Sequence, residues 1–128
     1  MSLNRTILVI GMNSSGSPVA QGDVLMQDVG TNNAWKNPGS AAQVDLLTAV
    51  VYEPYGIAMG AQGLLVTAGY VPKINLTATA SPGDRIRTSA TAFRADRNSA
   101  NGAGDFGVAL SSGSTPPAML FGTMPFRA

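Results

Sequence analysis

The feature that most constrains this chain is the regular alternation of short apolar runs with turn residues. From Gln21 onward, clusters of Gly, Pro, Asn, Asp and Ser recur at a spacing of roughly 8–12 residues, which is typical of strands in a sandwich or barrel. The apolar or alternating runs between them are too short for most helices. The clearest are residues 24–26, 64–66, 71–76, 86–93, 106–110 and 118–121. The pattern therefore predicts an all-β sandwich or barrel.

One stretch does not fit this pattern. Residues 40–43 read Ser-Ala-Ala-Gln, which fits a helix capping box, and residues 41–50 could continue as a short helix. Val50, Val51 and Tyr52 follow directly and favour a strand. We expect a short helix or turn that leads into a strand, and residues 40–50 themselves can be either helix or strand.

Two runs resemble each other, Tyr55–Met59 and Phe106–Leu110, each an aromatic residue, a glycine and an alternating apolar run. Gly-Asp pairs at 22–23 and 83–84 open the two segments that lead to these runs. The echo predicts two loosely similar halves with equivalent strands, in which the glycines permit close backbone approach. The predicted core consists of Ile57, Met59, Leu65, Ile86, Val108, Leu110 and Leu120.

The first twenty residues differ in composition from the rest. Ile7, Leu8, Val9 and Ile10 form an apolar run with strand propensity, and residues 11–18 have the composition of a flexible linker. The run can be an ordinary first strand of the domain. It can also be a strand-like arm that pairs with the sheet edge of a neighbouring chain. We predict the second organisation, with an arm and linker over residues 1–20 and a β-rich domain over residues 21–128.

Composition argues against several classes of function. The chain has no histidine and no cysteine, which removes the usual nucleophile–base pairs and the His or Cys ligands of metals. We therefore expect no catalytic residues, no cofactor and no metal. A net charge of +1 is too small for a dedicated nucleic-acid partner, and no apolar run approaches the ~20 residues of a membrane helix. Charged residues make up only 12%, so self-repulsion is weak and an assembled state is favoured.

Two groups of residues are candidates for an interface. Arg85, Arg87, Arg94 and Arg97 lie close together in the sequence with two aspartates among them. They can protect a solvated edge strand, or they can form ion pairs with another subunit or partner. Trp35, the single tryptophan, can close the barrel as a lid or anchor a binding interface.

Several short motifs suggest a family. Residues 83–87 read GDRIR, residues 104–110 read GDFGVAL and residues 116–122 read PPAMLFG. This pattern resembles the C-terminal half of the capsid cement, or head decoration, proteins of tailed bacteriophages. Residues 21–28 and 56–71 are similar to the first half of these proteins, so the resemblance covers about residues 21–122. Residues 35–54 form a longer insertion than the family pattern leads us to expect, and the arginine cluster has no counterpart in it.

The resemblance implies a small β-barrel or β-tulip-like domain and a structural virion protein. Such a protein is made in the host cytoplasm, sits on the outer surface of the capsid, usually as a homotrimer, and clamps neighbouring major capsid protein subunits. It implies no catalytic residues. The alternatives are a receptor- or carbohydrate-binding β domain of a tail fibre or spike, for which Tyr52, Glu53 and Tyr55 form the best patch, and a tail or head-completion ring component.

Overall fold

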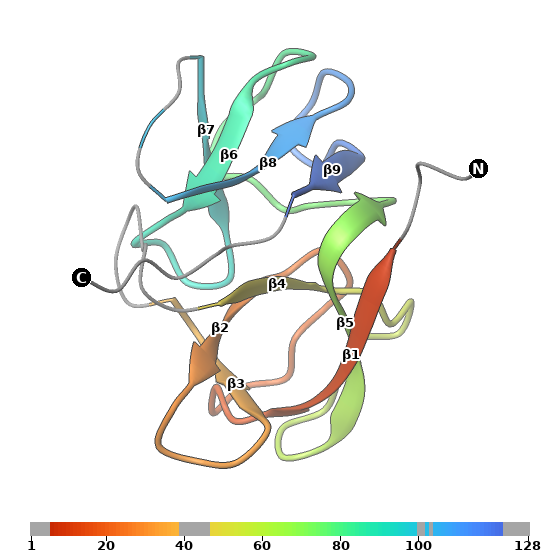
Figure 1. Ribbon diagram of the computed structural model, residues 1–128, viewed down its shortest axis with the longest axis vertical. Helices are drawn as coiled ribbons and strands as arrows, with labels where there is room; N and C mark the ends of the chain where they lie inside the picture. The colour runs from red at the N-terminus through yellow and green to blue at the C-terminus, as the bar shows by residue number, and fades with distance from the viewer. Residues whose placement is uncertain (1–5, 39–46, 100–101, 103, 122–128) are drawn as a thin grey trace.

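The computed structural model describes residues 6–38, 47–99, 102 and 104–121, and in these residues it contains strands and no helix. The all-β prediction is therefore confirmed. Figure 1 shows a lower barrel and an upper sheet, with the chain passing from one to the other along β5. The nine strands are β1 (Ile7–Asn13), β2 (Val24–Asp28), β3 (Ala34–Lys36), β4 (Thr48–Val51), β5 (Gln62–Val71), β6 (Arg85–Thr88), β7 (Ala95–Asn98), β8 (Asp105–Ala109) and β9 (Ala118–Leu120).

The barrel has five strands in the order β1-β3-β2-β4-β5, and β5 pairs back with β1 to close it. The β1–β5 pairing is antiparallel and extends from Ile7 to Met12, whereas β1 pairs with β3 in parallel only at Met12 and Asn13. The closure is therefore long on one side of β1 and short on the other.

The second sheet continues from the end of β5. Residues Gly69–Val71 leave the barrel and pair with β9, and the order then continues through β8 and β6 to β7. Gly69 has a φ of 105°, a left-handed conformation that suits glycine. Val66 before this glycine and Val71 after it are both fully buried. On a regular strand, two side chains five positions apart would point to opposite faces. The strand therefore changes its buried face at Gly69.

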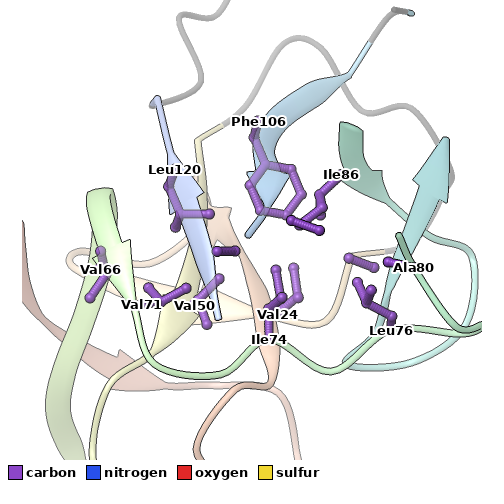
Figure 2. Packing of buried hydrophobic residues seen from close by; sticks show 13 residues of the cluster. Val24, Val50, Val66, Val71, Ile74, Leu76, Ala80, Ile86, Phe106 and Leu120 are labelled. Atoms are coloured by element: carbon purple, nitrogen blue, oxygen red, sulfur yellow. The ribbon is translucent and has the colours of Figure 1, made fainter. Parts of the chain in front are cut away.

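The two layers have separate cores that share three strands. Leu25, Val51 and Leu65 face the barrel interior, while their neighbours Val24, Val50 and Val66 face the second sheet. Figure 2 shows Phe106, Ile86 and Leu120 of the second sheet directed towards this same layer. Because successive side chains on a strand point to opposite faces, β2, β4 and β5 are apolar on both faces. This explains their uninterrupted runs of Val and Leu.

A Gly-Asp turn precedes three of the strands, β2, β6 and β8. The glycine of each turn has a φ between 81° and 89°, and the aspartate side chain accepts a hydrogen bond from the backbone N–H three residues earlier. Such carboxylate-to-backbone bonds stabilise a turn locally. The Gly-Asp pairs of the sequence thus encode three similar turns. The donors are Ala20, Ser81 and Gly102.

The proposed equivalence of the two echoing runs is wrong. Phe106–Ala109 lies in β8, but Tyr55–Met59 forms turns around one isolated bridge, between Ile57 and Val19. The predicted close backbone approach is nevertheless confirmed. A Cβ atom at Gly56 would overlap the carbonyl oxygen of Val19, and one at Gly107 would lie 2.8 Å from Cδ2 of Leu120.

The core prediction is correct at Ile57, Leu65, Ile86 and Leu120, which are all buried. It is wrong at three other positions: Met59 and Leu110 are exposed, and Val108 is half-buried on the outer face of the second sheet. In β8, Phe106 and Ala109 face the core instead, because the register of β6 against β8 shifts between Ile86 and Arg87. Such a bulge changes which residues of a strand face inward.

The predicted division at residue 20 is also wrong, because β1 is a barrel strand of its own chain. The segment after it is anchored as well. Ser14 donates its backbone N–H to the carbonyl of Trp35, and Val19 exchanges backbone hydrogen bonds with Ile57. The expected short helix or turn falls on residues 40–46, outside the described residues, and Thr48–Val51 is the strand expected after it. The described residues include no helix long and apolar enough to cross a membrane.

Candidate interaction surfaces

The free edge of β1 is the most unusual surface of the barrel. Met12 donates its N–H to the carbonyl of Asn33, and among the described residues no strand pairs with this edge from Ile7 to Gly11. Backbone groups alternate between the two edges of a strand, so the N–H and C=O of Leu8 and Ile10 point to the same edge as those of Met12. These polar groups are therefore available for a further strand.

The side chains beside this edge are apolar. Ile7, Leu8 and Ile10 are 50%, 43% and 58% exposed, whereas Val9 packs partly against the barrel core. Ile10 pairs with Leu64, which also accepts a backbone hydrogen bond from the half-exposed Tyr52. The outer wall of the barrel next to the edge is thus apolar across β1 and β5. Of the candidate interface residues in the N-terminal run, three are exposed and Val9 is half-buried.

A second accessible surface, not predicted from the sequence, is the outer face of the second sheet. The strand registers place four residues in one row across it: Tyr70 opposite Met119, Met119 opposite Val108, and Val108 opposite Arg85. The guanidinium carbon of Arg85 lies 5.8 Å from the ring centre of Phe121, within cation–π range. We call these five residues the second-sheet face. Tyrosine, methionine, phenylalanine and arginine are the types that are enriched in protein interfaces.

The arginine cluster divides into different environments. Nε of Arg87 lies 3.5 Å from Oδ1 of Asp105, and Nη1 of Arg97 lies 3.7 Å from Oδ2 of Asp84. Both carboxylates belong to Gly-Asp turns of the same chain. Arg87 and Arg97 are therefore directed at turns of their own chain, so the sequence-predicted cluster is not one surface.

The two other arginines of the cluster have different settings. Arg85 belongs to the second-sheet face, whereas Arg94 lies exposed in the turn between β6 and β7. The structure thus places one arginine of the four among accessible apolar side chains.

Trp35 lies inside the barrel and is only 6% exposed. A Cβ atom at Gly11 would overlap its indole ring, so the ring packs directly against the backbone of β1. Its position corresponds to a core residue beneath β1 rather than to an interface anchor. The absence of a side chain at Gly11 is the sequence signal for this packing.

A polar hollow of about 280 Å³ lies beside the turn that connects β2 and β3. Gln27, Asp28, Thr31, Asn32 and Asn33 are among its lining residues. Asp28 already accepts hydrogen bonds from the Ser14 hydroxyl and the Gly30 N–H. The hollow has room for a small polar group. Each of the two carboxylate oxygens of Asp28, however, already accepts a hydrogen bond from the protein itself.

The patch around Glu53 is only partly available. One carboxylate oxygen of Glu53 accepts the N–H of Leu64 at 2.8 Å, so this side chain holds the start of β5. Tyr55 is fully exposed nearby, on a turn closed by the hydrogen bond from Gly56 N–H to the Glu53 carbonyl.

No protein-family model matches the chain, and no curated protein matches it significantly. Among the described residues, no three His, Cys, Asp or Glu side chains come together in a group that could hold a metal ion.

Proposed function

We propose that this chain is a structural virion protein that binds the outside of an assembled bacteriophage capsid and stabilises it. It would do so without catalysis, by clamping neighbouring major capsid protein subunits, and the resemblance implies that it acts as a homotrimer. The capsid as partner comes from the similarity of residues 83–87 and 104–110 to cement proteins.

The observation that carries the proposal is the second-sheet face. Its row of Tyr70, Met119, Val108 and Arg85 lies on paired strands, so the backbone positions of these residues are fixed relative to one another before any partner binds. A preorganised face loses little conformational freedom on binding. A protein that binds only the assembled shell shifts the equilibrium towards that shell, and the shift grows with its concentration relative to Kd.

Binding to shells tests the proposal. Purified chain is mixed with empty capsids of the phage that encodes it, and the bound fraction is measured by co-sedimentation and the shell melting temperature by calorimetry. We expect saturable binding and a higher melting temperature. The double variant Tyr70→Ala/Arg85→Glu should bind about tenfold more weakly or worse, since a tenfold loss corresponds to about 1.4 kcal/mol.

Tyr55→Ala is the matched control, because Tyr55 is equally aromatic and fully exposed but lies on a barrel loop. It should bind as the unmodified chain does. Absence of co-sedimentation at every concentration of the unmodified chain would contradict the proposed function. Binding that survives the double variant would retain the function and exclude the second-sheet face.

The polar hollow beside the β2–β3 turn favours a second candidate, a receptor- or carbohydrate-binding domain of a tail fibre or spike. Amide and carboxylate side chains such as Gln27 and Asn32 suit the hydroxyl groups of a saccharide. A glycan array decides this candidate. Specific binding that Asn32→Ala abolishes, combined with no binding to capsids, would replace the first proposal.

A further inference from the structure

The free edge of β1 combines two properties that isolated proteins rarely show together. Its main-chain groups at Leu8 and Ile10 have no strand partner among the described residues, and the side chains at the same positions are apolar and exposed. Unprotected apolar edges promote uncontrolled pairing between chains, so proteins usually blunt them with charge or cover them. Residues 6–13 contain no charged residue at all.

We propose that β1 pairs antiparallel with β1 of a second copy, about a twofold axis that passes beside Val9. The pairing places Leu8 opposite Ile10 of the second copy, and Val9 opposite the second copy's Val9. It does not depend on capsid binding, but it replaces the homotrimer that the cement-protein resemblance implies with a dimer.

The direction of the backbone groups and the extent of the free edge, Ile7–Gly11 with Val9 at its centre, together determine this register. The N–H and C=O groups of Leu8 and Ile10 point to the free edge, so in an antiparallel pair these two residues occupy the hydrogen-bonded positions. With Val9 at the axis, Leu8 exchanges both main-chain hydrogen bonds with Ile10 of the partner, and Ile10 does so with Leu8. A register shifted by one residue would place outward-pointing groups opposite inward-pointing ones and lose these bonds.

The side chains fit the same register. Directly opposite residues in an antiparallel pair point to the same face, so Leu8 contacts the second copy's Ile10 on the outer wall of both barrels. Both are apolar and both are exposed in the single chain. No charge within the segment opposes the approach of an identical copy.

The length of the free edge favours a twofold contact over other arrangements. The hydrogen bond from Met12 to Asn33 ends the free edge on one side, which leaves Ile7–Gly11. A contact between identical segments uses both edges completely and closes on itself, whereas a head-to-tail contact leaves an edge free at each end unless it forms a ring. The other terminal strand, β7, is not an equivalent acceptor because residues 75–77 cover it at Ala95.

A cysteine at the axis tests the register. The chain has no native cysteine, so any disulfide reports the introduced residue alone. In Val9→Cys the two Cα atoms would lie about 4.5 Å apart, within the range that a disulfide spans. In the control Thr6→Cys, on the same exposed segment, they would lie about 20 Å apart at 3.3 Å per residue. Mild oxidation should convert Val9→Cys into a covalent dimer on a non-reducing gel and leave Thr6→Cys as a single chain.

An exposed residue tests the contact without touching the core. Sedimentation of the unmodified chain at micromolar concentration should give twice the 13.1 kDa of one chain. Ile10→Lys should give a single-chain mass with an unchanged melting transition, because the side chain at this position is exposed. Ile10→Val, which preserves the apolar edge, should remain a dimer.

Three results would overturn the proposal. One is a single-chain mass for the unmodified protein up to about 100 µM, which would mean a dimer Kd above that concentration. Another is a dimer that survives Ile10→Lys, or that forms no disulfide in Val9→Cys. The third is the threefold mass that the cement-protein resemblance implies, which would leave the proposed capsid binding intact and assign the edge to another contact.

Discussion

The two strands at the ends of the sheet order, β1 and β7, differ in how their outer edges are protected. Figure 1 shows them at opposite ends of the molecule. β7 carries Asp96 and Arg97, and residues 75–77 lie along its outer side, with Thr77 bound both to the carbonyl of Ala95 and to the Asp96 carboxylate. The exposed positions of β1 carry only apolar side chains.

The difference shows which edge is protected against pairing. Charge and a covering segment are the usual means of blunting an edge strand, and β7 has both. Among the described residues, β1 has neither, and its segment is as rich in β-branched residues as many strands that pair readily. The contrast supports a role in assembly for β1 and a purely intramolecular role for β7.

The largest expected effect on stability concerns Trp35, which packs beneath β1 in the barrel core. Trp35→Ala should lower the free energy of unfolding by about 3–5 kcal/mol, because it empties the space against Gly11 and Leu65 in the barrel core. Urea denaturation measures the loss. Phe106→Ala, the matched change beneath the second sheet, should cost a similar amount. A Trp35→Ala variant with an unchanged midpoint would return the tryptophan to the role of a surface anchor.

A smaller effect is expected beside β7. Arg87 pairs with Asp105, and both side chains are largely buried, so Arg87→Ala leaves a carboxylate without its cation. We expect a loss of about 1–3 kcal/mol, the usual cost of an unpaired buried polar group. Thermal unfolding measures it, and Arg94→Ala is the control, because an exposed substitution usually stays within about 0.5 kcal/mol. Equal melting temperatures for the two variants would mean that Arg87 does not brace the turn.

The contrast between the edges also indicates what could be predicted from the sequence. Short apolar runs between turn residues were sufficient for the all-β class, and the Gly-Asp pairs at 22–23 and 83–84 marked the starts of β2 and β6. The inward faces of β8 and of the second half of β5 could not be predicted. A bulge and a left-handed glycine invert the alternation there, and both depend on contacts between distant segments.

For the same reason, only part of the candidate interface could be predicted from the sequence. The apolar character of Ile7, Leu8 and Ile10 is visible in the sequence, but their exposure depends on how little of β1 the strand β3 covers. The partners of Arg87 and Arg97 are also set by strand register. Tyr70 and Met119 lie 49 positions apart in the sequence and become neighbours only through the β5–β9 pairing, so no local pattern indicates the second-sheet face.

The smallest expected effect concerns Arg97 on β7. It tests whether this charge protects the edge against pairing or stabilises the fold. The Arg97–Asp84 contact is 3.7 Å long and the arginine side chain is 43% exposed, so the pair should contribute less than about 1 kcal/mol. Arg97→Ala should therefore shift the melting temperature only slightly, and less still in high salt, where exposed charges are screened. Arg97→Ile should be as stable but give the β7 edge an apolar residue. If charge protects this edge, sedimentation of Arg97→Ile should show species larger than those of Arg97→Ala at equal concentration. Identical sedimentation of the two variants would mean that residues 75–77 alone protect β7, because their hydrogen bonds at Ala95 are unaffected by either substitution.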